Sequence, residues 1–439
     1  MSPELTTILM IASLFILLAG FPLAFNLGTV GLVFGLLTTG QAYLYMIPMR
    51  VVNGILSQYI IAAVPLFIFM GTMMQTSGVA ERAFHILNRW MSGINGGLAL
   101  ATIVLAMLFA ATTGVVGASE TAIGLLVVPP MLQAKYSKSL ASGCVCAGGT
   151  LGILIPPSIM LILYAPMAGV SVIQMFSGAV IPGILLGTFY IIYVLVVTWF
   201  KPEMGPKLPT EEQLNFFTKE SLILGLKYLL PPISLIVLVL GSIFVGFASP
   251  TEAGAVGSIG AILLGLIYRR LTWKEFRENC FVTIRVTSMI IFIAVAASMF
   301  TGAFLGAGCG DVITNFLKGL GLGPWGIFIT MLLIILFLGM FIDWIGILMI
   351  IVPIFSPMLM SLGFDPLWVG LVVCTSLQIS FLTPPFAYSI FYLKGINVGL
   401  ELPEMYKGIV PFVGLQVLVV ILIIVFPQLC LWLPKVLAN

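Results

Sequence analysis

The chain has 439 residues, of which 61% are hydrophobic and only 8% are charged, and its mean hydropathy is +1.21. Soluble domains carry roughly 25% charged residues, so this composition leaves no room for a sizeable water-soluble domain. The net charge is only +3 and no basic stripe is interleaved with aromatic residues, which argues against nucleic acid as a partner. The composition therefore predicts a membrane protein.

The sequence contains no familiar catalytic or metal-binding motif. The single histidine, His85, lies among charged residues, and GxSxG, HExxH and phosphate-loop motifs are absent. Cys144 and Cys146 could hold a soft metal, but two small apolar residues at a tight helix contact are the simpler interpretation. We predict that the chain is not an enzyme and holds no cofactor or metal other than coupling ions.

Apolar runs near the ~20 residues needed to cross a bilayer recur along the chain. The N-terminus has no basic segment ahead of the first run, so we do not expect a cleaved signal peptide. The runs predict helices at about 5–24, 27–47 and 59–77, an amphipathic segment at 79–92, a hairpin at 97–132, helices at 139–168, 174–200, 222–247, 252–271 and 284–308, a second hairpin at 323–361, and helices at 363–393 and 409–434.

The placement of basic residues predicts an orientation. If both hairpins return to the side from which they enter, Arg50, Lys318 and Lys435 fall on one side and the other fifteen of the 18 basic residues fall on the opposite side. Such a bias marks the cytoplasmic side. We therefore predict a multi-pass protein of the bacterial inner membrane, with both termini outside and most Lys and Arg loops in the cytoplasm.

Two parts of the chain resemble each other. Each contains an acidic residue in an apolar hairpin, then a Pro-Met-Leu segment, then a helix interrupted by Pro-Pro. The orientation makes them enter from opposite sides, which predicts inverted repeats in an all-α polytopic membrane protein. A chance match between apolar segments is the alternative. The predicted ranges are 59–200 for the first repeat, with its hairpin at 97–132 and broken helix at 139–168, and 284–434 for the second, with its hairpin at 323–361 and broken helix at 363–393.

The Pro-Pro breaks predict a cation site. Proline removes an amide donor, so nearby carbonyls lose their partners, and unpaired backbone groups are costly in hydrocarbon. A sodium ion could replace the lost bonds. Gly149, Thr150 and Gly152 precede the first break, and Ser380 and Thr383 precede the second.

The hairpin tips predict the binding of an anion. A helix N-terminus at mid-membrane carries partial positive charge that suits a carboxylate, and neither hairpin contains Lys or Arg. Ionisable residues at membrane depth are usually functional, and Glu120 and Asp343 are such residues. Either carboxylate could bind a cation or could simply cap a half-helix. The predicted substrate-binding residues are Thr112, Thr113, Gly117, Glu120, Thr121, Pro156 and Pro384.

Three segments resemble one family. Residues 148–158 (GGTLGILIPPS), 117–132 (GASETAIGLLVVPPML) and 338–343 (LGMFID) are similar to the large, DctM-type membrane subunit of tripartite ATP-independent periplasmic (TRAP) transporters. The resemblance implies a sodium-coupled elevator mechanism, in which a transport domain slides against a scaffold. It also implies two partners, a small four-helix membrane subunit and a periplasmic substrate-binding protein. The family's sodium sites correspond here to Ser119, Gly149, Thr150, Gly152, Asp343, Gly346 and Thr383.

Two residues depart from many members of this family. Glu120 stands where many members carry a small polar residue, and Trp344 follows Asp343 where many have a smaller one. These features resemble a subgroup linked to 2-oxo acids and other monocarboxylates. We therefore expect sodium-coupled uptake of a small organic anion. A stand-alone cation-coupled carboxylate carrier is the alternative. An intramembrane enzyme or a channel would need a nucleophile, a metal set or a continuous pore that the sequence does not indicate.

Overall fold

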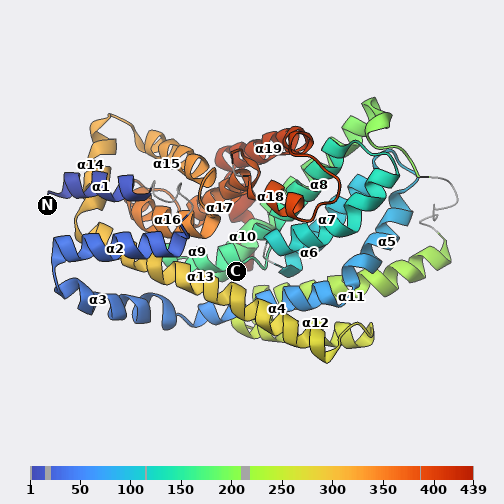
Figure 1. The fold of residues 1–439 in the computed structure, drawn as a ribbon, viewed down its shortest axis with the longest axis horizontal. Coiled ribbons are helices and arrows are strands. Elements are labelled where there is room, and N and C mark those ends of the chain that lie inside the picture. The colour runs from blue at the N-terminus through green and yellow to red at the C-terminus, as the bar shows by residue number, and fades with distance from the viewer. Residues whose placement is uncertain (1, 15–20, 114–115, 209–217, 386, 439) are drawn as a thin grey trace.

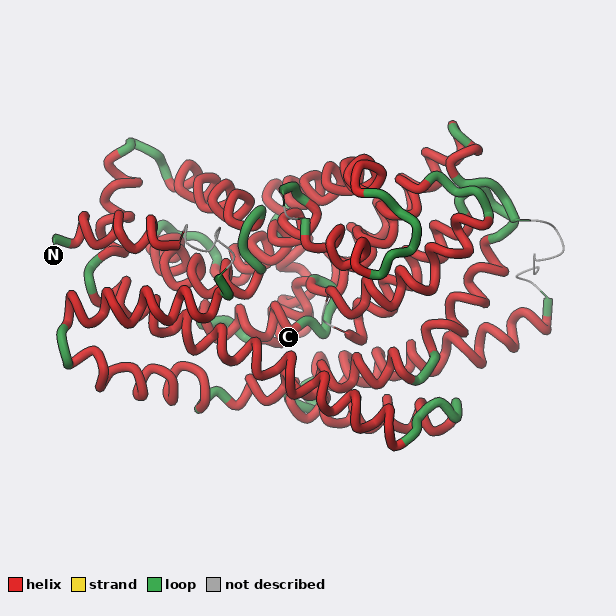
Figure 2. Tube along the Cα trace, viewed as in Figure 1, coloured by secondary structure: helices red, strands yellow, loops and turns green. Residues whose placement is uncertain are grey.

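The computed structural model describes residues 2–14, 21–113, 116–208, 218–385 and 387–438. The protein is all-helical, with 83% of residues in helices and no strand in these ranges, as Figure 2 shows. The helices that precede the first hairpin and form it are α1 Pro3–Leu14, α2 Leu23–Thr39, α3 Ala42–Val51, α4 Ala63–Thr76, α5 Val79–Met91, α6 Gly97–Thr113 and α7 Val116–Gln133. The next are α8 Lys138–Thr150, α9 Ile159–Ala168, α10 Val172–Phe200, α11 Lys219–Phe244, α12 Pro250–Ile267 and α13 Trp273–Gly306. The last are α14 Cys309–Gly319, α15 Pro324–Gly339, α16 Trp344–Ser361, α17 Pro366–Leu382, α18 Tyr388–Gly395, α19 Leu402–Val425 and α20 Gln428–Leu437.

Seven helical segments in the described ranges are long and apolar enough to cross a membrane. Large apolar side chains on the outermost of them face outward. On α11, for example, Leu226, Leu230 and Val237 are each more than half exposed. Such a surface suits lipid rather than water. The prediction of an all-α polytopic membrane protein is confirmed.

The same order of elements occurs twice, in α4 to α10 and in α13 to α19 (Figure 1). In each half a long apolar helix is followed by a short amphipathic one, α5 or α14, and both short helices begin after a left-handed glycine, Gly78 (φ 72°) or Gly308 (φ 75°). Two helices of a hairpin follow, then an interrupted helix. The amphipathic segment predicted at 79–92 is α5, whereas α14, in which only Asp311 and Lys318 are charged, was not predicted.

Three predicted helices have different bounds. The predicted helix at 27–47 is divided into α2 and α3 at Gly40, whose φ of 69° ends the first helix. The predicted helix at 284–308 starts earlier, because Thr272 and Glu275 form a reciprocal capping box in front of Trp273. The predicted helix at 409–434 is interrupted before Pro427, since proline cannot donate to the preceding turn. Part of the predicted helix at 5–24, residues 15–20, lies outside the described residues.

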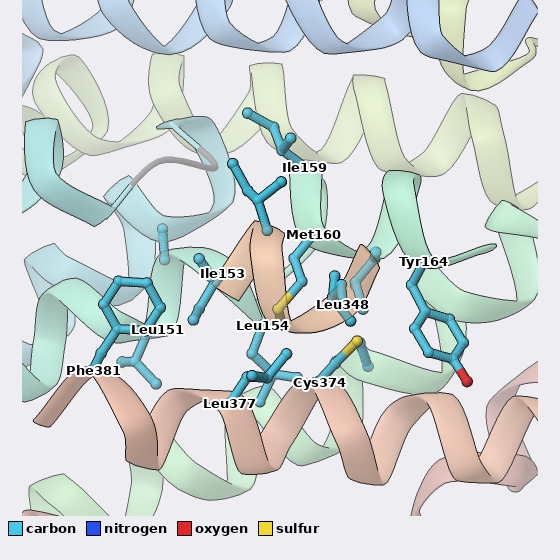
Figure 3. Close-up of a cluster of buried hydrophobic side chains, with 14 of the residues drawn as sticks. Leu151, Ile153, Leu154, Ile159, Met160, Tyr164, Leu348, Cys374, Leu377 and Phe381 are labelled. Atoms are coloured by element: carbon cyan, nitrogen blue, oxygen red, sulfur yellow. The ribbon is translucent and has the colours of Figure 1, made fainter. Parts of the chain in front are cut away.

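The two interrupted helices pack against each other in the centre of the protein. Figure 3 shows Leu151, Ile153 and Leu154, which belong to the first interruption, beside Leu377 and Phe381 of α17. These side chains are at most 4% exposed. The second half of each interrupted helix also packs on the other hairpin, α9 on α16 and α18 on α7. The two halves of the chain therefore meet at the helix breaks.

Candidate functional site

The first break is where the sequence predicts it. Helix α8 ends at Thr150, a 3-10 turn follows at Leu151–Ile153, and α9 begins only at Ile159, after the buried Pro156. The Ser158 hydroxyl donates a hydrogen bond to the Ile153 carbonyl at 2.5 Å. A side chain thus replaces one of the backbone bonds that the break removes.

The second break is more open to solvent than the first. Helix α17 ends at Leu382 and α18 begins at Tyr388, with exposed Pro384 and half-buried Thr383 between them. The Thr383 hydroxyl donates to the Ile379 carbonyl at 2.6 Å, and the Tyr406 hydroxyl of α19 donates to the Pro385 carbonyl at 3.3 Å. The predicted interruption of both helices is confirmed.

Glu120 lies directly against the end of α8. Its side chain is fully buried, and a Cβ atom added to Gly149 would lie 2.0 Å from Glu120 Cγ and 2.7 Å from Oε1. The neighbouring Gly148 faces Ala106 of α6, whose Cβ would be 2.7 Å from a side chain there. The two consecutive glycines therefore let both arms of the first hairpin approach α8 closely.

The Glu120 carboxylate has no hydrogen-bond partner in the described parts of the chain for either oxygen. The salt bridges in those parts are Lys138–Glu404 and Arg270–Glu81, so no basic side chain pairs with it. The buried Ser389 hydroxyl of α18 lies near the carboxylate. In the described residues this hydroxyl also has no partner with hydrogen-bonding geometry. An unsatisfied buried polar group in a native fold calls for an explanation, and a bound ion is one of the known explanations.

Helix α18 connects Glu120 to Asp343. The Tyr392 ring lies over Gly117, where an added Cβ would be 2.7 Å from the ring, and Tyr392 lies in the neighbourhood of both carboxylates. The Tyr388 hydroxyl donates to the Phe341 carbonyl at 3.4 Å, next to Asp343 in the second hairpin. The tips of both hairpins therefore contact the short helix that follows the second break.

Asp343 occupies the N-cap position of α16, with φ −64° and ψ 152°. Its half-buried carboxylate forms no hydrogen bond of capping geometry, although the amides of Trp344 and Ile345 interact with it electrostatically. The hairpin also touches α17, because a Cβ on Gly339 would lie 1.9 Å from Ser380 Oγ. Asp343 thus lies at the positive end of a helix, in a hairpin that packs on the helices of the second break.

The other predicted cation ligands are dispersed between these two centres. Ser119 and Gly152 are buried near the first break. The Thr150 hydroxyl donates to the Ala147 carbonyl at 2.8 Å and accepts from Gln416 Nε2 at 3.2 Å. Gly346 does not face the other predicted ligands. A Cβ there would be 2.4 Å from Leu23 Cδ2, so the side of Gly346 on which a side chain would stand packs against α2.

Among the predicted substrate ligands, Thr121 uses its hydroxyl locally, donating to the Gly117 carbonyl at 2.7 Å. Thr112 and Thr113 end α6 beside the hairpin tip, and their side chains lie outside what the structure describes. Gly117 is covered by Tyr392. Helix α18 thus contacts both hairpin tips, whereas the Thr121 hydroxyl is used within α7.

Buried glutamines were missed by the sequence analysis. Gln378 of α17 is fully buried, and neither its Oε1 nor its Nε2 has a partner in the described ranges. Gln416 of α19 is also fully buried, with an unsatisfied Oε1. Both could have been identified, because polar residues in the middle of an apolar helix are rare and usually functional. Ser389 and Tyr392 carried no comparable signal.

Comparison with known proteins gives the family. The family model described as "Tripartite ATP-independent periplasmic transporter, DctM component" matches residues 9–429. The C4-dicarboxylate TRAP transporter large permease protein DctM of Vibrio cholerae is 31% identical, over 98% of this chain and 98% of that protein. The sialic acid TRAP transporter large permease protein SiaM of the same species is 29% identical, over 97% and 98%.

The fold also has a solved counterpart. The YdaH transporter of Alcanivorax borkumensis superposes with a TM-score of 0.66 at 15% sequence identity, over 97% of this chain and 99% of that one. The named relatives are transporter permease subunits, so the prediction that the chain is not an enzyme is confirmed. TRAP large permeases work with a small membrane subunit and a periplasmic binding protein. The chain belongs to the DctM family and is a multi-pass large permease of the TRAP transporters.

Proposed function

We propose that this permease moves a small organic anion together with sodium ions across the bacterial inner membrane. In this proposal it works with a small membrane subunit and a periplasmic binding protein that delivers the substrate. The observation that carries the proposal is the buried Glu120 carboxylate, which lies on Gly149 at a helix break and lacks a partner in the described residues.

The energetics of burial support a cation at this position. An ionised carboxylate buried without a partner costs several kcal/mol even after relaxation. A sodium ion would neutralise the Glu120 charge and would accept oxygen ligands from the break. The Ser389 hydroxyl, which has no partner in the described residues, lies near the Glu120 carboxylate and could be a further oxygen ligand of this ion. These surroundings favour a cation-binding role for Glu120 over the substrate-binding role that the sequence analysis assigned to it, because a carboxylate repels a carboxylate substrate.

The anion in this proposal binds at the helix N-termini of the hairpin tips. Helices α7 and α16 both begin there, and their first amides carry partial positive charge. The relatives named above transport a C4-dicarboxylate and sialic acid, both of which are organic acids. We propose the same general class for this chain. The narrower proposal, a 2-oxo acid or another monocarboxylate, rests only on the resemblance of positions 120 and 344 to those of one subgroup of the family.

The coupling of sodium to substrate determines how much net charge crosses the membrane in each transport cycle. If two sodium ions accompany one monocarboxylate, the net charge moved is +1, which contributes about 2.3 kcal/mol per 100 mV of membrane potential. We propose an elevator motion in which the two hairpins and interrupted helices move together against α2, α4, α11, α12 and α13. The close packing of α9 on α16 and of α18 on α7 supports such a joint movement.

The test is uptake by reconstituted protein. The permease is placed in liposomes with its small membrane subunit, and labelled pyruvate, succinate or sialic acid is supplied with the binding protein under an inward sodium gradient. Replacing sodium by potassium should reduce uptake by at least tenfold. Equal uptake in the two gradients would refute sodium coupling. Sodium-dependent uptake without either partner protein would instead support the stand-alone carrier.

A further inference from the structure

A second polar feature lies away from the helix breaks, at the end of α3. Arg50 is in the last turn of this helix, and a single π-helical turn follows at Val52–Leu56. Such turns often occur at functional sites. Arg50 borders an open cavity of about 280 Å³ that is lined by the segment from α3 to Ile61 and by α9, α13 and α16.

Arg50 is the one charged residue in the lining of this cavity. The salt bridges in the described part of the chain do not include it, so its guanidinium has no carboxylate partner there. Its side chain lies across α13 at Gly302, where an added Cβ would be 3.0 Å from Arg50 Cδ and Nε. The missing side chain at position 302 therefore leaves room for the guanidinium beside the cavity.

The cavity is lined by helices from both halves of the candidate site. Helix α9 is the continuation of the first interrupted helix, and α16 is the arm of the second hairpin that begins after Asp343. Pro353 removes the donor that would bond the Met349 carbonyl, and the Thr301 hydroxyl of α13 donates to that carbonyl at 3.3 Å instead. Half-buried Ser298 adds a second hydroxyl to the lining.

We propose that this cavity binds the carboxylate of the transported acid before the acid reaches the helix breaks, with Arg50 as its cationic ligand. Arg50 has no carboxylate partner in the described residues, and arginine binds carboxylate in a bidentate manner. The cavity is near the lower end of the ~300–1,000 Å³ typical of small-molecule sites, so it fits a small acid. That the bound acid is the cargo rests on the proposed function. A lipid phosphate offers the same chemistry, and the test separates the two.

The first experiment measures local charge and needs no known substrate. Ser298→Cys is made in a Cys280→Ser background, because Cys280 is the one native cysteine that is not buried. Its reaction rates with an anionic and a cationic methanethiosulfonate reagent are compared. Arg50 should raise the anionic-to-cationic ratio by about tenfold. Arg50→Gln should abolish this preference and Arg50→Lys should keep most of it.

The control places the thiol on α16, at a position outside the lining of the cavity. At Ser361→Cys, on the exposed last turn of α16, the ratio should not change with Arg50→Gln. If the anionic-to-cationic rate ratio at position 298 is the same with Arg50 and with Arg50→Gln, in variants that remain monodisperse, the inference is overturned.

The second experiment identifies the occupant. Millimolar pyruvate or succinate should slow labelling at position 298 by at least threefold in wild-type Arg50 protein and not in Arg50→Gln. Protection by phosphatidylglycerol nanodiscs alone, without protection by either acid, would assign the cavity to lipid and overturn the inference. Failure of sodium-dependent uptake with the charge preference intact would instead count against the proposed function, so the two failures are distinguishable.

Discussion

Glu120 and Gly149 occupy a space that admits only one side chain. Glu120 Cγ lies 2.0 Å from the point at which a Cβ on Gly149 would stand, so the glycine is what allows the carboxylate to rest on the end of α8. This contact joins the tip of the first hairpin to the first break.

Gly149→Ala should displace Glu120. A methyl group at this position must move the carboxylate or α8, and such overpacking typically costs about 1–3 kcal/mol. Thermal unfolding of the purified protein should show this loss, and sodium-dependent uptake should fall by at least tenfold. Gly241→Ala in α11 is the matched control, because nothing lies within 4 Å of a Cβ there, and it should leave both values unchanged or slightly raise stability.

Glu120→Gln should weaken stabilisation by sodium. The amide keeps the shape of the side chain but removes the charge that a cation would neutralise. A ligand present at 100 times its Kd stabilises the native state by about 2.7 kcal/mol. Replacing potassium by sodium should therefore raise the Tm of the wild-type protein clearly and that of Glu120→Gln little. Equal shifts in the two proteins would remove Glu120 from the cation site.

Asp343→Asn should separate cation binding from helix capping. Asparagine is as good an N-cap as aspartate, so a residue that only caps α16 should tolerate this change. We expect sodium-dependent uptake to fall at least tenfold while the amount of protein in the membrane stays near wild type. Asp343→Ser, another good N-cap without charge, should behave in the same way. Unchanged sodium dependence in both variants would show that Asp343 acts as a cap.

Pro156→Ala should impair transport by restoring an amide donor where α8 and α9 are separated. The alanine allows the helix to continue and to withdraw carbonyl oxygens from the break. Pro411→Ala is a suitable control, since this proline lies inside the continuous helix α19. We expect uptake to decrease several-fold only in the first variant, at matched expression. Wild-type uptake by Pro156→Ala would refute the role assigned to the break.

The features that were predicted correctly are those that local chemistry determines. Proline cannot donate a backbone hydrogen bond wherever it stands in a fold, so the breaks near Pro156 and Pro384 were readable from the sequence. The amphipathic helix α5 was readable from its charged residues. The interruption before Pro427 was missed although it follows the same rule, because the apolar run continues across it.

The features that were missed depend on contacts between distant parts of the chain. Tyr392 covers Gly117, and Ser389 lies near Glu120, although about 270 residues separate each pair. No periodicity in the sequence reports such a contact. The same holds for Gly346, whose open side faces Leu23 of α2. The helix positions of the site were therefore predictable, whereas the partners of its side chains were not.

Direct binding of sodium tests the central claim that the carboxylate at the first break holds a cation. Purified wild-type protein and Glu120→Gln are compared by equilibrium binding of labelled sodium, with unlabelled sodium as competitor. We expect saturable binding by the wild-type protein and an affinity at least tenfold lower in the variant. Identical binding curves for the two proteins would contradict the account.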